Sequence, residues 1–270
     1  MPAVVWRDLG RVEYGEALAL QREIALARRE DPDAEDVILL LEHPPVLTYG
    51  RAASRAHIVE EPARLAERLV SVVEIERGGD VTYHGPGQLV GYPIIDLEGF
   101  RKDLHWYLRS LEEVLIRTLG GLGLAAARAD GLTGVWVGAG LESMIDAGQP
   151  EGDGRVVSIT RDRAAAAMRT GEIRKIASIG IHASRWVTMH GFALNRTDEA
   201  LEGFRWIVPC GLDGVTVTSI QSEGIDVSAD ELARRVIGAF ADVLGVVIRP
   251  DDRVSTRPES RDDRVSRSAG

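Results

Sequence analysis

The apolar residues of this chain come in short runs of strand length, and this pattern limits what the chain can fold into. Three such runs are DVILLLE at 36–42, LVGYPIIDL at 89–97 and RWVTMHGFAL at 185–194. No apolar stretch approaches the roughly 18 residues that a membrane-spanning helix needs. With 270 residues, 44% of them hydrophobic, the chain can bury a real core, which excludes global disorder.

Helical periodicity lies between these runs. Ala and Leu recur at helical spacing in 13–30, and a leucine stripe follows Asp103, a predicted N-cap, to about Leu119. Ser228 and Glu231 form a capping box ahead of a final amphipathic helix. Helices that alternate with groups of strands indicate an α+β fold, in which a mixed, mostly antiparallel sheet is flanked by helices.

The remaining segments complete one predicted domain over residues 1–250. Further strands are predicted at 3–9, 70–76, 134–138, 174–181 and 215–220, and short helices at 60–69 and 198–206. The segment from about 142 to 172, rich in Gly, Asp, Arg and Ala, is predicted to be a surface insertion with a small hairpin or one helical turn. Residues 251–270 are polar, and we expect a disordered tail.

The charge of the chain argues against nucleic acid and anionic lipid as partners, and its single cysteine indicates a reducing compartment. The formal net charge is -10, whereas binding to nucleic acid or anionic lipid needs a surplus of Lys and Arg. The N-terminus lacks the basic and then apolar segments of a secretory signal, and a single cysteine, Cys210, allows no internal disulfide. We therefore expect a cytoplasmic protein that binds neither nucleic acid nor membranes.

A glycine-rich loop at 77–88, RGGDVTYHGPGQ, is the first candidate for a ligand site. Glycine lets a backbone turn sharply and approach a ligand closely, so this loop can present amide groups to a negatively polarised atom. It lacks the ending of a nucleotide P-loop and the spacing of a dinucleotide fingerprint. On glycine content alone, an ordinary connecting loop is an equally good interpretation.

Cys210 stands between Pro209 and Gly211, a combination typical of a turn with an accessible side chain. A lone cysteine is most often a small buried apolar residue. A neighbouring base, a positive charge or a helix N-terminus would instead make Cys210 a nucleophile.

Lysine is rare in this chain, which makes Lys175 the candidate for that neighbour. Of the 32 basic side chains only two are lysines, Lys175 and Lys102. Lysine, unlike arginine, can lose its proton when it is desolvated, so a partly buried Lys175 at the start of RKIASIGI could act as a base toward a thiol. A surface lysine at a strand end is the alternative, and Lys102, in a polar segment, fits that alternative better.

The six histidines form no recognisable metal site, because they are scattered and no second cysteine accompanies them. His84 lies in the glycine-rich loop, where it could orient a substrate carbonyl. His182 and His190 fall in predicted strands, where a satisfied structural histidine is the usual finding. No G-x-S-x-G occurs, so a Ser-His-Asp hydrolase lacks its signature. We expect neither a metal nor a cofactor.

Four segments together resemble one family, the octanoyltransferases of lipoic acid biosynthesis, also called lipoyl(octanoyl) transferases. The segments are 77–94, 134–138, 174–195 and 207–220, they occur in the order typical of the family, and the resemblance covers most of the chain between about 35 and 222. It implies the fold of the catalytic domain of biotin and lipoate protein ligases.

The resemblance also implies an activity. Such enzymes take an octanoyl group from octanoyl acyl carrier protein and attach it as an amide to a lysine of a lipoyl domain. The implied acceptors are the E2 subunits of 2-oxoacid dehydrogenases and the glycine cleavage H protein. The resemblance implies that Cys210 attacks the thioester and holds the acyl group, and that Lys175 activates Cys210. The implied substrate-binding residues are Arg77, Gly78, Gly79, Asp80, Val81, Thr82, Tyr83, His84, Ser178, Ile179, Gly180, Gly191, Phe192 and Ala193.

This chemistry is consistent with a chain that has no nucleotide motif. Exchange of one thioester for another is nearly balanced in energy, and formation of the amide draws the reaction forward. Backbone amides near 178–180 or in 77–84 are expected to stabilise the oxyanion. An arginine-rich rim of Arg77, Arg174 and Arg185 is expected to attract acidic carrier domains.

Two other functions stay open at this point. An ATP-dependent lipoate ligase on the same scaffold would have no use for Cys210. A binding protein that shelters an acyl chain would transfer nothing, and it would tolerate the loss of Lys175.

Overall fold

The computed structural model describes residues 4–141, 146–147, 157–208 and 215–251. Its central element is a mixed ten-stranded sheet in the order β13-β1-β2-β6-β12-β11-β8-β7-β10-β9. The β1–β13, β1–β2 and β7–β10 pairs are parallel, and the other neighbours are antiparallel. These strands are β1 (Val4–Arg11), β2 (Asp36–Glu42), β6 (Gln88–Ile94), β7 (Ala126–Ala129), β8 (Val135–Val137), β9 (Asp146–Ala147), β10 (Val157–Ile159), β11 (Arg174–Ser184), β12 (Val187–Asn195) and β13 (Ile248–Pro250).

A second, three-stranded sheet has the order β4-β3-β5, and helices flank both sheets. Its strands are β3 (Val46–Tyr49), β4 (Ser71–Glu74) and β5 (Val81–His84). The α-helices are α1 (Tyr14–Glu30), α2 (Pro62–Glu67), α3 (Leu104–Gly120), α5 (Arg161–Arg169) and α6 (Ala229–Leu244), and the 3-10 helices are η1 (Arg55–His57), η2 (Leu97–Gly99) and η3 (Asp198–Trp206). The predicted α+β class, with a mixed sheet between helices, is confirmed.

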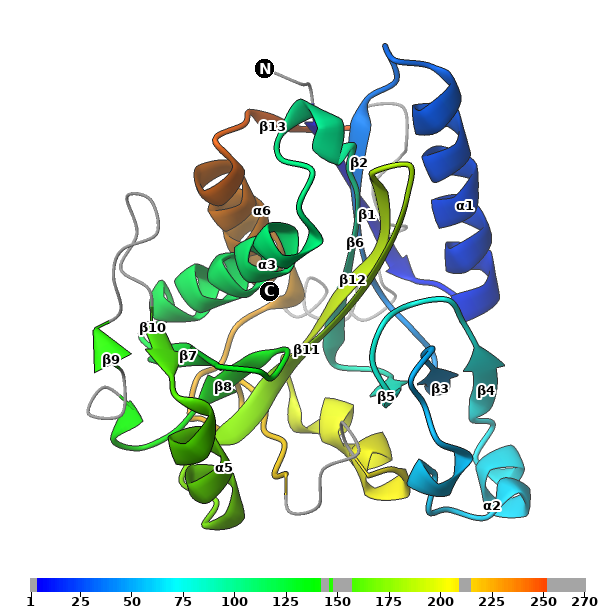
Figure 1. Cartoon of the computed structure of the whole chain (residues 1–270). Coiled ribbons are helices and arrows are strands. Elements are labelled where there is room, and N and C mark those ends of the chain that lie inside the picture. The colour runs from blue at the N-terminus through cyan, green and yellow to red at the C-terminus, as the bar shows by residue number, and fades with distance from the viewer. Residues whose placement is uncertain (1–3, 142–145, 148–156, 209–214, 252–270) are drawn as a thin grey trace, which may run out of the picture.

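Both faces of the central sheet are covered, which explains the continuous apolar run of β2. Figure 1 shows α3 and α6 on one face of the sheet and α1 on the other. Ile38 and Leu40 pack in the core that contains α3 and α6, whereas Leu39 and Leu41 pack in the core that contains α1. A strand buried on both faces needs apolar side chains at successive positions rather than at alternate ones.

The predicted helix caps are present. The Asp103 side chain accepts hydrogen bonds from the backbone amides of His105 and Trp106 at the start of α3. The Ser228 side chain accepts from the amide of Glu231 at the start of α6. Within the described residues, no helix is long and apolar enough to span a membrane.

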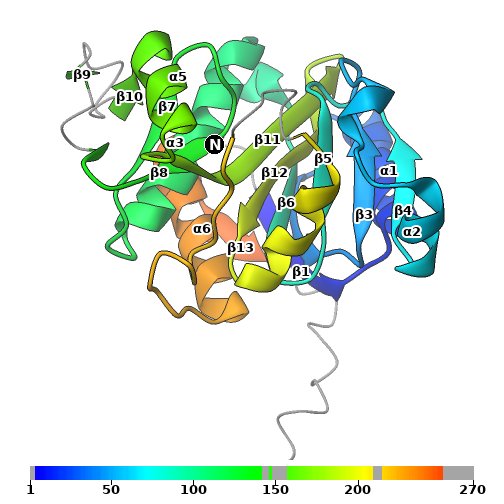
Figure 2. The ribbon, with the colours of Figure 1, turned by 90° about the horizontal axis from the view of Figure 1, so that it is seen from below.

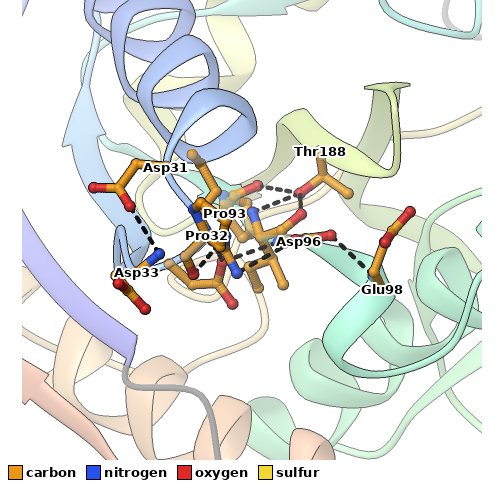
Figure 3. Close-up of polar contacts among 10 residues, drawn as sticks. Asp31, Pro32, Asp33, Pro93, Asp96, Glu98 and Thr188 are labelled. Atoms are coloured by element: carbon orange, nitrogen blue, oxygen red, sulfur yellow. Dashed lines mark hydrogen bonds and ion pairs between the residues drawn. The ribbon is translucent and has the colours of Figure 1, made fainter.

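Polar contacts hold one end of the central sheet together (Figure 3). Asp36, buried at the start of β2, accepts hydrogen bonds from Arg28 Nε and from the backbone amide of Asp96, both at 2.9 Å. Burial raises the pKa of Asp36, although these two bonds oppose the rise. Thr188 of β12 donates to the Pro93 carbonyl at 2.8 Å and accepts from the Ile95 amide at 3.0 Å. These contacts connect α1, β2, β12 and the segment after β6.

One predicted strand is wrong, since residues 215–220 form only an isolated bridge between Val217 and Lys175. The amide of Lys175 donates to the Thr216 carbonyl, and the amide of Thr218 donates to the Lys175 carbonyl. From Ala177 onward β11 pairs with β12, so only the first residues of β11 can accept a further segment.

Part of the segment predicted as a surface insertion belongs to the edge of the sheet. β10 pairs in parallel with β7, and α5 follows it directly. Ala164, Ala167 and Met168 of α5 are buried in one cluster with Trp136 of β8. The predicted tail, apart from Asp251, lies outside the described residues.

Candidate active site

The glycine-rich loop and the strands β11 and β12 enclose a pocket of about 360 Å³, a volume within the range of small-molecule sites. Lys175 lines the pocket, as do all the predicted substrate-binding residues except Tyr83. The pocket follows β11 from Lys175 to Ile181, a distance of roughly 20 Å at about 3.3 Å per residue. The loop and strands predicted from separate motifs therefore meet at one cavity.

Tyr83 lies in the core instead of at the pocket. Its ring packs edge-on against Phe204 and Trp206, with ring centroids 5.9 and 5.6 Å apart. These three residues belong to the cluster that joins β5 to η3, which lie beside each other in Figure 2. We therefore assign Tyr83 a packing role.

Glycines permit the close approach of the backbones around the pocket. The amide of Gly78 donates to the Ile181 carbonyl at 2.9 Å, which holds the loop against β11. A Cβ atom on Gly180 would lie 2.9 Å from Arg77 Cδ, and one on Gly191 would lie 2.2 Å from the Gly91 carbonyl oxygen. A larger side chain at Gly191 would push β12 away from β6.

The expected arginine rim is wrong for Arg77, whereas Arg174 and Arg185 stay predictions. Arg77 is buried, and its guanidinium donates to the Thr48 carbonyl at 2.8 Å and to the Gly78 carbonyl at 3.0 Å. Arg174 makes two hydrogen bonds to Glu223, at 2.9 and 2.8 Å. Arg185 lies in the turn between β11 and β12, at the opposite end of β11 from Lys175. Internal carbonyl and carboxylate acceptors thus hold the donors of Arg77 and Arg174.

Lys175 is buried, with only 4% of its surface exposed. Its Nζ lies over the Trp136 ring, 5.6 Å from the ring centroid. The alternative of a surface lysine is therefore wrong for Lys175. It is right for Lys102, which is exposed and forms an ion pair with Glu98 at 2.8 Å.

Cys210 lies outside the described residues, but the segments on both sides of it are anchored near the pocket. The amide of Val208 donates to the His57 carbonyl at 2.8 Å. The His57 ring in turn contacts Asp80, a residue of the pocket wall, with Nδ1 and Oδ2 2.5 Å apart. On the other side, Thr216 is bonded to the backbone of Lys175.

Neutral histidines and two tyrosines line the end of the pocket away from Lys175. His84 Nδ1 lies 2.8 Å from Gln88 Oε1, and His43 Nε2 lies 2.7 Å from the Tyr92 hydroxyl. Burial lowers the pKa of His84 to about 3 and the pKa of His43 to about 4. These two rings are therefore uncharged at neutral pH, and His84 adds no buried charge to the pocket wall.

His190 differs from the satisfied structural histidine that the sequence predicts. It lines the pocket and is buried, and neither ring nitrogen has a hydrogen-bond partner among the described residues. Its backbone φ is +59°, although it lies within β12. Burial lowers its pKa to about 4.

Several residues of the pocket wall have no signal in the sequence. Tyr14, Tyr92 and Trp136 belong to apolar stretches that predict core positions, and only the fold brings them to the pocket. In the described part of the chain, no group of three or more His, Cys, Asp or Glu side chains is arranged to hold a metal ion.

Comparisons with known proteins agree with this geometry. The family model of the lipoyl protein ligase A/B catalytic domain matches residues 13–241. An octanoyltransferase of Gloeobacter violaceus is 44% identical over 241 residues, which cover 89% of this chain and 90% of that protein. One from Solibacter usitatus is 41% identical over 244 residues, which cover 90% and 94%.

Two solved structures share the fold. A bipartite lipoate protein ligase from Thermoplasma acidophilum is 18% identical, with a TM-score of 0.64 and coverage of 96% of this chain and 88% of that one. A lipoate-protein ligase A bound with ATP is 17% identical, with a TM-score of 0.63 and coverage of 96% and 90%. The family model spans most of the chain, and the curated relatives match over nearly their full length, so the chain belongs to the lipoyl protein ligase A/B catalytic domain family.

Proposed function

We propose that this protein is an octanoyltransferase of lipoate biosynthesis that moves an octanoyl group from octanoyl acyl carrier protein to a lysine of a lipoyl domain. The acyl group is held on Cys210 as a thioester, and Lys175 activates that cysteine. The observation that carries the proposal is the buried amine of Lys175 at one end of a pocket closed by the glycine-rich loop. Identity of 44% to an octanoyltransferase supports the same activity.

In the first step, the Cys210 thiol gives its proton to the Lys175 amine, and the thiolate attacks the thioester carbonyl of the donor. The bond between the carbonyl carbon and the carrier sulfur breaks, and the carrier leaves as a thiol that takes the proton back. In the second step, the acceptor amine attacks the Cys210 thioester, an amide forms, and Cys210 leaves as a thiol. No nucleotide is consumed, because the amide is more stable than the thioester.

The pocket fits an uncharged aliphatic chain better than a charged ligand. Ile179, Phe192 and Ala193 line it along β11 and β12, and the histidines at its far end are neutral. Burial of an acyl chain contributes about 0.8 kcal/mol per methylene, so a tail of several carbons adds appreciably to the binding of the donor.

The partners follow from this chemistry. The donor is octanoyl acyl carrier protein, and the acceptors are the lipoyl domains of 2-oxoacid dehydrogenase E2 subunits and the glycine cleavage H protein. Arg77 is buried, so its guanidinium is not available to attract these domains.

The test is intact-mass analysis of the protein after incubation with octanoyl acyl carrier protein in the absence of ATP. We expect one octanoyl adduct that is absent from Cys210→Ser and that disappears when an unmodified lipoyl domain is added. Lys175→Met should slow adduct formation by about 10²–10⁴-fold, the usual contribution of a positioned base.

Three results would contradict the proposal. Adduct formation that persists in Cys210→Ser would remove the cysteine from the mechanism. Transfer that occurs only when ATP and the free acid are supplied would identify a ligase instead, and binding of the donor without transfer would identify an acyl-binding protein.

A further inference from the structure

Glu112 is a carboxylate in the interior of the protein that the proposed reaction does not use. It lies in the middle of α3 and is fully buried. A buried carboxylate is costly unless charged or polar groups pair with it. Glu112 Oε2 accepts a hydrogen bond from Arg109 Nη1 at 2.6 Å and lies 3.6 Å from Arg128 Nε. Both of these contacts are made by Oε2, and the arginines compensate the charge.

The other oxygen of Glu112 holds the loop that leads into β8. Oε1 accepts the backbone N–H of Gly134 at 3.2 Å. The three residues before Gly134, at 131–133, line the pocket. Gly134 has a φ of +122°, a conformation that favours glycine. The bond therefore fixes a backbone segment that has little intrinsic preference for its conformation.

Gly134 packs directly against the side chain of Lys175. A Cβ atom on Gly134 would lie 2.6 Å from Lys175 Cε and 3.2 Å from Lys175 Nζ. Trp136 of β8 pairs with Lys175 of β11, and the centroid of its ring lies 5.6 Å from Lys175 Nζ. The lysine side chain is therefore confined between the α-carbon of Gly134 and the Trp136 ring.

We propose that Glu112 is a positioning residue for Lys175, acting through the backbone of Gly134. Its carboxylate holds the 131–134 loop against α3, and the loop holds the amine of Lys175 in place at the pocket. The inference rests on the proposed function only for the role of Lys175 in catalysis, because the chain of contacts exists whatever reaction the pocket performs.

The neighbouring Glu113 provides a matched control. It lies on the same helix and binds Arg128 at 2.8 Å and Arg117 at 2.9 Å. It thus shares an arginine with Glu112, but its contacts lead to those arginines and not to the loop. If the acidic residues at this point of α3 have only an electrostatic or structural role, changes at Glu112 and at Glu113 should have similar effects on Lys175.

One conservative substitution tests the hydrogen bond. Glu112→Asp keeps the charge and withdraws the oxygen from the Gly134 amide by one methylene. If Glu112 positions Lys175 through Gly134, Glu112→Asp should be damaging, and Glu113→Asp, which shortens the neighbouring carboxylate, should be mild. A role in neutralising Arg128, which both carboxylates contact, predicts similar damage from the two changes.

The readout is the NMR spectrum of the full chain labelled with ¹³C and ¹⁵N only in lysine. The chain has just two lysines, so Lys102→Arg assigns both sets of side-chain signals, and Lys102 serves as an internal reference. We expect Glu112→Asp to move the Lys175 Cε signal, and Glu113→Asp to leave it near its wild-type position. Gly134→Ala should also move it, because the added methyl group needs the space of Lys175 Cε.

Kinetics then connect the position to the chemistry. In single-turnover acylation by octanoyl acyl carrier protein, Glu112→Asp should lower the maximal rate by roughly 10–100-fold while the donor concentration for half-maximal rate changes little, since a displacement of about 1 Å costs this much. An unmoved Lys175 signal in Glu112→Asp, or an equal movement in Glu113→Asp, would overturn the inference. Failure of the wild-type protein to form an acyl-enzyme would overturn the proposed function alone, because the Lys175 signal is measured without substrate.

Discussion

At the scale of single residues, His190 shows how the site departs from ordinary strand structure. Its φ of +59° is a conformation that non-glycine residues rarely adopt, and the cost of such strain is about 1–3 kcal/mol. The buried Gln21 accepts the His190 amide at 2.8 Å and so helps to hold the backbone there. Strain of this kind persists where the surrounding structure imposes it. Here it accompanies an imidazole at the pocket wall whose two nitrogens have no hydrogen-bond partner in the part of the chain that the structure describes.

A second strained position, Arg185, allows a test on stability. Arg185 and Trp186 connect β11 to β12 with φ values of +49° and +65°, the left-handed pair of a type I′ turn. Asn tolerates this conformation better than Arg, so Arg185→Asn should increase the free energy of unfolding in urea by about 0.5–1 kcal/mol. Arg51→Asn, an exposed change at a position with negative φ, should bring no such gain. A loss of stability in Arg185→Asn would mean that the exposed arginine contributes more than the turn costs.

The sequence predicts the residues of the reaction better than their surroundings. Lys175 is identifiable because lysine is rare and because its motif resembles that of a family. His190 is not, because a positive φ within a strand leaves no trace in a pattern of apolar and polar residues. The sequence predicts Arg77 at a rim, because it does not reveal that Thr48 and Gly78 supply acceptors for the guanidinium.

At the scale of elements, η1 joins the glycine-rich loop to the segment before Cys210. Asp80 accepts hydrogen bonds from the His57 ring and from the Ser54 amide, and the His57 carbonyl accepts the Val208 amide. A change in the glycine-rich loop can therefore alter the hydrogen bond of Val208 through η1, although η1 itself does not line the pocket.

This connection predicts an effect of Asp80→Ala on hydrogen exchange. Removal of both acceptor oxygens should release η1, so the Val208 amide should exchange faster, by roughly tenfold if about 1.4 kcal/mol of local stability is lost. Glu60→Ala, a change on the nearby surface, is the control. Equal exchange at Val208 in wild type and Asp80→Ala would show that η1 is held by its other contacts.

The long elements are predictable from sequence, whereas some of the short strands are not. α3 and α6 have caps and apolar stripes, and β2, β6, β11 and β12 have apolar runs, so local patterns suffice for them. β3 has four residues and β13 has three, and each pairs with a strand that is distant in the chain. The 215–220 segment has a strand-like sequence but forms no strand, because β12 occupies the edge of β11 from Ala177 onward.

At the scale of the whole molecule, three buried histidines give the fold a defined dependence on pH. His43, His84 and His190 have pKa values lowered to about 4, 3 and 4 by burial, whereas an unfolded histidine titrates near 6.5. Between these values the unfolded state binds protons that the folded state does not. Stability is therefore full above about pH 6.5 and falls as the pH decreases toward 4.

The expected slope of the free energy of unfolding is up to about 1.4 kcal/mol per pH unit for each histidine. Asp36 and Glu112 act in the opposite direction, because their raised pKa values let the folded state bind protons first. Urea unfolding at several pH values between 7.5 and 4.5, with His43→Gln for comparison, measures the effect. If the free energy of unfolding had the same slope against pH in the wild type and in His43→Gln, His43 would not contribute to the pH dependence.

The ion pair between Lys102 and Glu98 has a consequence if the protein holds an acyl group as a thioester, as proposed above. Any exposed primary amine on such a protein competes with the intended recipient, and each lysine on its own surface is an opportunity for self-modification. Arginine occupies nearly every basic position, Lys175 is buried, and Lys102 is paired with a carboxylate. The side chains of this protein therefore present few accessible amines that an acyl thioester could modify.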